Sequence, residues 1–158
     1  MKLKQWMKTA LFSATVSVLL TLAACMTLPN YGTERVARDK VILTAHDNIG
    51  IPYRSGGDNP DRGFDCSGLT HFAYQHSGIE IPRTVYQQYK QRHRVSDMNL
   101  RPGDLVFFKK WFRRVSHVGI YLGNGKFIHS PEKGQTVRIS NLSDRYWKKR
   151  YAGAGNFF

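Results

Sequence analysis

Cysteine is scarce in this sequence, because the 158 residues contain only two, Cys25 and Cys66. So small a number excludes a scaffold held together by several disulfides. The sequence also lacks the closely spaced cysteine pairs that are typical of structural zinc sites. Each cysteine therefore needs its own explanation, and if Cys25 is used elsewhere, Cys66 has no partner for an intramolecular disulfide.

A long hydrophobic run is missing as well. The uncharged stretch from Thr9 to Leu22 is too short and too weakly apolar for a membrane-spanning helix. Because Lys2, Lys4 and Lys8 precede it, it is typical of the middle of a secretory signal. We therefore assign residues 1–24 to a targeting segment and leave them out of the fold.

The end of this segment, Leu22-Ala23-Ala24-Cys25, resembles the lipobox of bacterial lipoproteins. The resemblance implies that Cys25 carries lipid and membrane attachment, since several acyl chains hold a protein where one holds only marginally. Residue 26 is Met and not Asp, which in a Gram-negative host implies the outer membrane, facing the periplasm. An ordinary cleaved signal or an uncleaved anchor, with Cys25 incidental, stays open as the alternative.

Acidic residues are few, at 11 against 24 lysines and arginines, for a net charge of +13. Removing the three signal lysines leaves +10 from residue 25 onward. Such a charge suggests a polyanionic partner, but an exported protein meets little nucleic acid and we expect no nucleic-acid binding. Anionic lipid, the carboxylates of cell-wall peptides, or a merely solvated basic face remain open. The basic runs are Lys109-Lys110 to Arg113-Arg114 and Lys148-Lys149-Arg150.

The rest of the chain has room for one domain, residues 34–158, after a short tether at 25–33. Helical patterns come first and extended patterns follow Pro102-Gly103, which predicts an α+β domain with helices packed on an antiparallel sheet. The expected helices are Glu34–Asn48, Cys66–Ser77 and a short one after Thr84. The expected strands are Asp104–Lys109, His117–Leu122, Lys126–Ser130 and Thr136–Ser140, with a further strand possible within Tyr146–Phe158.

Cys66 occupies the predicted start of the second helix, with Asp65 as its N-cap. Unpaired N–H groups and the positive end of the helix dipole stabilise a thiolate there, so we expect the pKa of Cys66 below its free value of about 8.5. On this evidence alone, a buried structural cysteine is the better interpretation. A nucleophile needs a base nearby.

A predicted hairpin supplies two histidines. Alternation places His117 with Gly119 and Tyr121 on one face of the first strand. A two-residue turn would bury His129 on the apolar face, whereas a three-residue loop, with Gly125 left-handed, pairs Gly119 with His129 and Ile120 with Ile128. We expect the second register, because it brings both histidines to one face.

Four blocks of this sequence resemble those of the NlpC-type cell-wall cysteine peptidases. They are Phe64-Asp65-Cys66-Ser67-Gly68-Leu69, Arg101-Pro102-Gly103-Asp104-Leu105-Val106-Phe107-Phe108, Ser116-His117-Val118-Gly119-Ile120-Tyr121 and Phe127-Ile128-His129-Ser130. The resemblance implies a papain-like α+β fold and thiol-dependent hydrolysis of peptide bonds in peptidoglycan, with no metal or other cofactor.

Residue roles follow from this resemblance position by position. It makes Cys66 the nucleophile, His117 the base and His129 the residue that orients the base. Tyr53 corresponds to a tyrosine near the oxyanion, and the backbone N–H of Ser67 or Cys66 is a second donor to it. Arg83 either binds a carboxylate of the stem peptide or closes a helix start.

Other interpretations were weighed against a peptidase. A zinc site of Cys66, His117 and His129 is chemically possible, but no His-x-x-x-His helix accompanies it. A catalytically silent peptidoglycan-binding lipoprotein with the same fold is the main alternative, and an acyltransferase is a weaker one. Which peptidoglycan bond would be cut, D-alanyl to diaminopimelate or D-glutamyl to diaminopimelate, does not follow from the sequence.

Overall fold

The computed structural model describes residues 31–110 and 114–158. The predicted signal, most of the predicted tether and Cys25 lie outside this range. In the described part of the chain, no helix is long and apolar enough to cross a membrane. The helices are α2 (Tyr31–Asp47), α3 (Cys66–His76), α4 (Val85–Gln91), the 3-10 helix η2 (Asp97–Asn99) and α5 (Arg145–Lys148).

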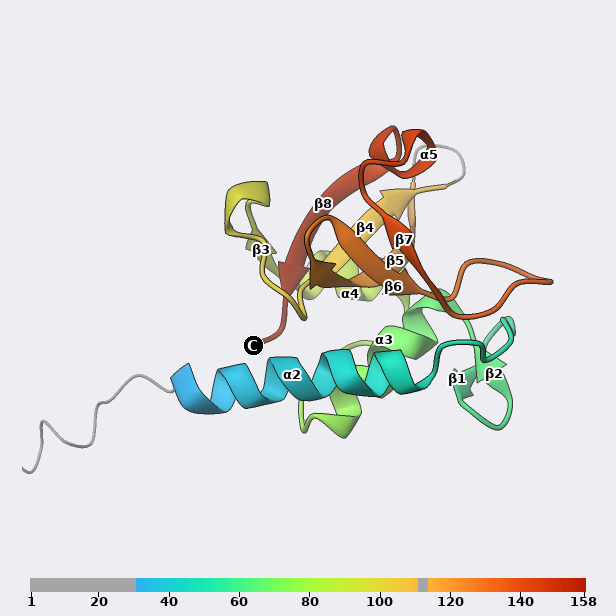
Figure 1. Cartoon of the computed structure of the whole chain (residues 1–158), viewed down its shortest axis with the longest axis horizontal. Coiled ribbons are helices and arrows are strands. Elements are labelled where there is room, and N and C mark those ends of the chain that lie inside the picture. The colour runs from blue at the N-terminus through green and yellow to red at the C-terminus, as the bar shows by residue number, and fades with distance from the viewer. Residues whose placement is uncertain (1–30, 111–113) are drawn as a thin grey trace, which may run out of the picture. The chain divides into compact units, whose positions relative to one another are not determined.

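Six strands form one antiparallel sheet in the order β3-β8-β4-β5-β6-β7. They are β3 (His93–Val95), β4 (Leu105–Lys109), β5 (Val115–Gly123), β6 (Lys126–His129), β7 (Arg138–Asn141) and β8 (Tyr151–Asn156). A separate small ladder joins β1 (Asp58–Asn59) to β2 (Gly63–Phe64). Helices α2, α3 and α4 precede nearly all of this sheet (Figure 1), which confirms the predicted α+β class.

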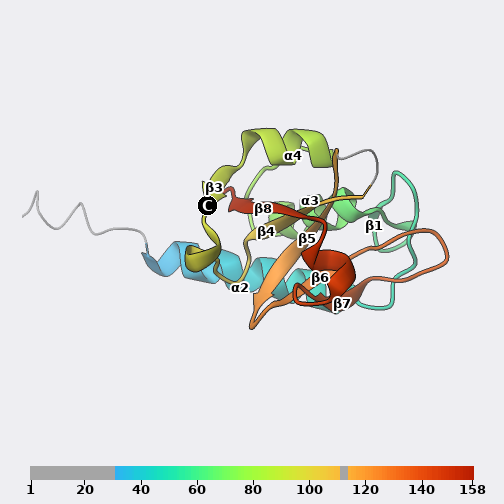
Figure 2. The ribbon, with the colours of Figure 1, turned by 90° about the horizontal axis from the view of Figure 1, so that it is seen from above.

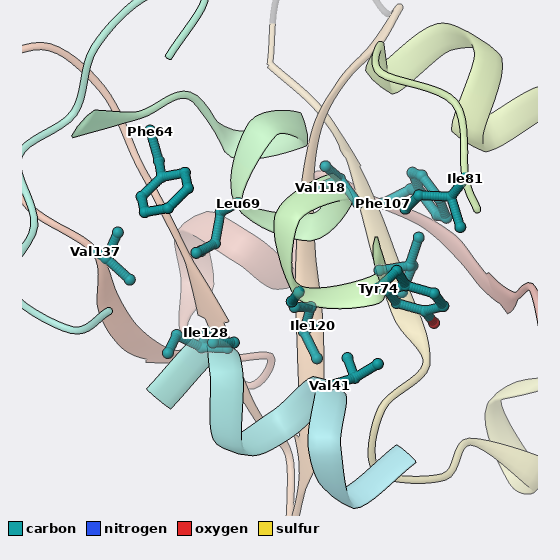
Figure 3. Packing of buried hydrophobic residues seen from close by; sticks show 13 residues of the cluster. Val41, Phe64, Leu69, Tyr74, Ile81, Phe107, Val118, Ile120, Ile128 and Val137 are labelled. Atoms are coloured by element: carbon teal, nitrogen blue, oxygen red, sulfur yellow. The ribbon is translucent and has the colours of Figure 1, made fainter. Parts of the chain in front are cut away.

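The sheet has an apolar layer on each face. On β4, Leu105 and Phe107 belong to one buried cluster while Val106 and Phe108 belong to another, as the two-residue period of a strand requires. The first cluster lies under α2 and α3, and Figure 3 shows Val41 pointing from α2 toward Ile120 of β5. The four consecutive apolar residues of β4 thus reflect burial on both sides.

Two of the predicted helix starts are confirmed by their caps. The Asp65 carboxylate accepts a hydrogen bond from the N–H of Gly68 at 2.7 Å and begins α3. The Thr84 hydroxyl accepts one from the N–H of Gln87 at 3.4 Å and begins α4. These bonds satisfy N–H groups that have no partner inside the helix. Helix α2 begins at Tyr31, so the last residues of the predicted tether are helical.

The β5–β6 hairpin has the predicted pairing of Ile120 with Ile128, but it is reached in another way. Asn124 and Gly125 both have positive φ and form a two-residue turn closed by the pair Gly123 and Lys126. A bulge between Tyr121 and Gly123 places one extra, unpaired residue in β5, so the pairing beyond it is the same as a three-residue loop would give. The predicted three-residue loop is therefore wrong, whereas the register that it was meant to produce is confirmed.

The C-terminal segment contains the further strand predicted within Tyr146–Phe158, preceded by a helical turn that was not predicted. Residues 145–148 form the helical turn α5, and only residues 151–156 pair as β8, between β3 and β4. Trp147 of α5 is 6% exposed and packs on Phe108. A large aromatic ring that covers one face of the sheet explains why the chain turns here before it enters β8. Figure 2 shows α5 over the β6–β7 end of the sheet.

Candidate active site

Cys66 is the first residue of α3 and is a half-buried free thiol. The backbone N–H groups of Val118 and Ser67 act on its thiol, and both lower its pKa. Val118 directly follows His117 in β5, so the start of α3 rests against the strand that carries the predicted base. The local fold thus joins the first and third sequence blocks.

The electrostatics of Cys66 contradict the prediction made from its helix position. Burial, and next the Asp65 carboxylate, raise the pKa of the thiol to about 11. The N–H groups of Val118 and Ser67 and the Lys110 ammonium oppose this rise without cancelling it. The expected low pKa is therefore wrong, because loss of water and the capping carboxylate outweigh the donors at the helix start.

His117 and His129 form a buried hydrogen-bonded pair. Nε2 of His117 lies 2.9 Å from Nδ1 of His129, and Nε2 of His129 lies 3.0 Å from the Ser140 hydroxyl oxygen. His117 is 1% exposed and His129 is 0% exposed. If Nδ1 of His117 is to accept a proton, its Nε2–H donates to His129, whose Nε2–H then donates to Ser140. This arrangement of protons gives each contact of the chain one donor and one acceptor and leaves Nδ1 of His117 unprotonated.

Both imidazoles are held in the neutral form. Burial, and then the neighbouring His129, lower the pKa of His117 well below its usual range. Burial, and then Arg138 and Lys110, lower the pKa of His129 to about 3. The resting site therefore pairs a neutral thiol with neutral imidazoles.

Trp147 holds the histidine pair from one side. Its ring stacks on His117 with centroids 5.3 Å apart and planes at 22°, and it meets His129 edge to face at 4.9 Å. Sequence reasoning assigned no role to Trp147 or to Ser140. Ser140 pairs with Phe127 in the β6–β7 ladder, so it lies diagonally across from His129. That register was the available signal, since a serine at this distance can hydrogen-bond the imidazole.

Tyr53 lies within electrostatic reach of the thiol. Burial, and then the charges of Cys66 and Asp65, raise the pKa of the Tyr53 hydroxyl. Its backbone pairs with Phe64, two residues before Cys66, and its N–H donates to the Gln135 carbonyl at 2.8 Å. Tyr53 is therefore positioned near Cys66, between the loop that precedes α3 and the loop between β6 and β7.

Arg83 forms a double ion pair with the helix cap. Its Nη1 and Nη2 lie 3.0 and 2.8 Å from the two Asp65 carboxylate oxygens. The same guanidinium donates to the Ser67 hydroxyl at 3.1 Å and to the Gly57 carbonyl at 3.0 Å. Of the two predicted roles for Arg83, this geometry favours closing the start of α3. Ser67 itself is 5% exposed, and its hydroxyl also donates to Asp65.

No set of three His, Cys, Asp or Glu side chains within residues 31–110 and 114–158 is arranged to hold a metal ion. Cys66, His117 and His129, weighed above as a zinc site, are thus not grouped as metal ligands. Instead, one nitrogen of His117 and both nitrogens of His129 take part in the hydrogen-bonded chain.

Comparison with known proteins gives this geometry a context. The sequence model of the NlpC/P60 family matches residues 50–156, which include every residue of the site. Murein DD-endopeptidase MepH of Escherichia coli is 46% identical over 124 residues, covering 76% of this chain and 44% of the relative. Gamma-DL-glutamyl hydrolase of Bacillus subtilis is 40% identical over 134 residues, covering 80% of this chain and 32% of that relative.

A solved structure agrees with the fold. The crystal structure of an NlpC/P60 family protein from Bacillus cereus superimposes with a TM-score of 0.71 at 38% identity, covering 76% of this chain and 40% of that one. The predicted papain-like arrangement is thereby confirmed. The chain spans less than half the length of the two curated relatives and of this structure.

Proposed function

Because the chain belongs to the NlpC/P60 family, we propose that it is a cysteine endopeptidase that hydrolyses peptide bonds of peptidoglycan. The observation that carries the proposal is the buried chain of His117, His129 and Ser140, together with the packing of Cys66 in one cluster with Val118, the residue after His117 in β5. A protein that only bound the cell wall would have no need for buried, linked imidazoles beside a thiol. The names of the two relatives, an endopeptidase and a glutamyl hydrolase, point to the same chemistry.

In the proposed mechanism, Nδ1 of His117 takes the thiol proton as the Cys66 sulfur attacks the scissile carbonyl carbon. The carbon–nitrogen bond then breaks, and His117 gives its proton to the leaving amine. Water, deprotonated by His117, cleaves the thioester and restores the thiol. Because the pKa of Cys66 is high and that of His117 is low, we propose that the proton moves during the attack and not before it.

The oxyanion formed in each step needs donors that are already in place. We propose the Tyr53 hydroxyl and the backbone N–H of Ser67 or Cys66 for this role. Tyr53 is supported by the electrostatic effect of Cys66 on its hydroxyl, and Ser67 by its place at the start of α3, where its N–H lowers the pKa of the thiol. We assign Arg83 to holding Asp65 and the start of α3 in place.

Digestion of purified sacculi by the wild type and by Cys66→Ala tests the proposal. We expect the wild type to release new amine termini and Cys66→Ala to release none, with mass spectrometry of the fragments identifying the bond. The candidate bonds are D-alanyl to diaminopimelate and D-glutamyl to diaminopimelate, and the two relatives' names, a murein DD-endopeptidase and a gamma-DL-glutamyl hydrolase, do not decide between them. Equal release of amine termini by both proteins would refute the proposed peptidase activity of Cys66. Sacculus binding without release by either would favour the catalytically silent lipoprotein.

We further propose that Cys25 is lipidated and anchors the domain in the cell envelope, at the outer membrane of a Gram-negative host. The support is the Leu22-Ala23-Ala24-Cys25 sequence after a basic and apolar start. Labelled palmitate should enter the wild type but not Cys25→Ser. Palmitate label that persists in Cys25→Ser, or that is missing from both proteins, would refute the proposed lipid anchor at Cys25.

A further inference from the structure

A pocket of about 230 Å³ is lined by Trp147, the residue whose ring contacts both histidines of the buried pair. Trp147 forms part of its wall while stacking on His117. The side chains that concern its chemistry are Lys110, Glu132, Gln135, Arg138, Asp144 and Trp147. The pocket and the proposed base thus share one residue, Trp147.

This pocket is also close to the thiol and to Tyr53. The charge of Lys110 lowers the pKa of each of Cys66, His117 and His129, so its ammonium lies within electrostatic reach of all three. The loop between β6 and β7, which supplies Glu132 and Gln135, accepts a hydrogen bond from the N–H of Tyr53 through the Gln135 carbonyl. Figures 1 and 2 both show this loop beside the β1–β2 segment that leads into Cys66. A substrate held at Cys66 can therefore reach the pocket.

The charges in the pocket are of both signs, and two of them lack an opposite partner. Lys110 donates to Glu132 at 3.0 Å and to the Pro131 carbonyl at 3.1 Å. Arg138 and Asp144 line the same pocket, yet in the described parts of the chain neither forms an ion pair. The Asp144 carboxylate accepts one backbone hydrogen bond, from the N–H of Asn141 at 3.3 Å. Within the described residues, one cation and one carboxylate of the pocket thus have no counter-ion and can pair with the charges of a ligand.

Gln135 adds an unused acceptor. Its side-chain nitrogen donates to Glu132 at 2.9 Å, while its side-chain oxygen is buried and has no hydrogen-bond partner among the described residues. A buried acceptor without a donor is costly in free energy, and a bound N–H group would remove that cost. The pocket thus offers a guanidinium to a carboxylate, and a carboxylate and an amide oxygen to an ammonium.

We propose that this pocket binds a zwitterionic amino-acid group of the substrate, with an ammonium and a carboxylate on one carbon. In a stem peptide, such a group is the free end of a diaminopimelate residue. The inference rests on the proposed function and adds to it a preference for stem peptides whose diamino acid is not cross-linked. Arg138 binds the carboxylate, and Asp144 with the Gln135 oxygen binds the ammonium.

Binding to the intact Cys66→Ala protein tests the pocket without catalysis. Three tripeptides serve as probes. The first is alanyl-γ-glutamyl-diaminopimelate. The second has lysine as its third residue and so lacks the side-chain carboxylate, and the third is acetylated on the side-chain amine of diaminopimelate. We expect the first to bind about tenfold more tightly than either analogue, since one charge-assisted hydrogen bond is lost in each. Arg138→Gln should abolish the preference over the lysine peptide, and Asp144→Asn the preference over the acetylated one.

Lys133→Gln is the matched control, because Lys133 is an exposed cation of the same loop that does not line the pocket. It should keep both preferences. Equal binding of the three peptides, or preferences that survive in Arg138→Gln and Asp144→Asn, would overturn the inference. Hydrolysis of sacculi without any such preference would refute the pocket alone. Retained preferences in a chain whose wild type cuts nothing would refute the proposed function alone.

Discussion

Ser140 ends the chain of buried histidines, with its hydroxyl oxygen 3.0 Å from Nε2 of His129. In the proposed mechanism this hydroxyl accepts from Nε2–H of His129, so that Nδ1 of His129 accepts from His117 and Nδ1 of His117 acts as the base. A neutral imidazole has two tautomers, and only one of them suits the proposed reaction. The serine is thus a positioning residue that acts through His129.

Ser140→Ala should lower kcat about tenfold to a hundredfold, because a buried N–H of His129 loses its acceptor at a cost of about 1–3 kcal/mol. KM should stay unchanged, since Ser140 is assigned no substrate contact. Ser140→Thr, which keeps the hydroxyl, should restore kcat, whereas Ser143→Ala at an exposed serine should have no effect. Unchanged kcat in Ser140→Ala, or no rescue by threonine, would show that the hydroxyl does not position His129.

The high pKa of Cys66 makes a prediction about its reactivity. Only the thiolate is alkylated, so with a pKa of about 11 the rate of iodoacetamide modification should keep rising from pH 7 to pH 10. Cys25→Ser protein removes the other cysteine, and mass spectrometry of the Cys66 peptide follows the reaction. The unfolded chain should level off near its ordinary pKa of about 8.5. A plateau of the folded protein at or below pH 7 would instead indicate a preformed thiolate.

At the scale of elements, Arg83 joins the start of α3 to the Gly-rich loop before it and to the residue that caps α4. Its planar guanidinium makes a two-point contact with Asp65 and further bonds to Ser67 and Gly57. An ammonium cannot reproduce this set, because it is a single charge on a flexible stem. The junction therefore depends on the shape of the arginine as well as on its charge.

Arg83→Lys should reduce the free energy of unfolding by about 1–2 kcal/mol, measured by urea denaturation, since the partly exposed pair is partly screened. Arg62→Lys is the matched control, because Arg62 forms a single, more exposed ion pair with Asp58 and should change stability much less than Arg83→Lys does. Unchanged stability of Arg83→Lys, combined with weaker substrate binding, would return Arg83 to the role of a carboxylate clamp.

The strand pairing could be predicted where burial fixes it. Moving the β5–β6 register by one residue would bury His129 with the apolar side chains and expose Ile128, so hydrophobic pattern alone selects Ile120 opposite Ile128. The way the chain reaches this register could not be predicted. A three-residue loop and a two-residue turn with a bulge place the same residues in register, and Gly123 and Gly125 allow either.

Short and polar elements could not be predicted from pattern. Strand β3 has three residues, His93–Val95, and forms only because β8 offers it an unpaired edge. Likewise, α5 depends on the packing of Trp147 against the histidine pair. Trp147 and His117, whose rings stack, are 30 residues apart in sequence. The predicted low pKa of Cys66 was wrong for the same reason, because this pKa depends on burial by Val118 and other residues distant in sequence. Tertiary contacts, which a local sequence pattern does not contain, decide all three.

At the scale of the whole molecule, the positive charge is concentrated in the C-terminal third of the chain. Residues 105–158 contain eleven lysines and arginines against two acidic residues, a net charge of +9, whereas residues 25–104 carry ten against nine, a net charge of +1. Arg145, Lys148 and Lys149 of this region are exposed, on or directly after α5. The same region supplies Lys110 and Arg138 to the pocket beside Trp147. The basic face and the proposed substrate pocket therefore belong to one part of the molecule.

This arrangement predicts that binding to the polyanionic cell wall is electrostatic and is directed by that face. Sacculus binding by the Cys66→Ala protein should weaken several-fold as salt rises from about 0.05 to 0.5 M, since exposed charges are screened over roughly 10 Å or less at these concentrations. Reversing Arg145, Lys148 and Lys149 to glutamate should remove most of the salt-sensitive binding. The same reversal at Arg35, Lys40 and Arg94, which are equally exposed but lie in the nearly neutral part of the chain, should remove much less. Equal losses in the two triple variants would mean that net charge, and not the position of the basic face, brings the protein to the wall.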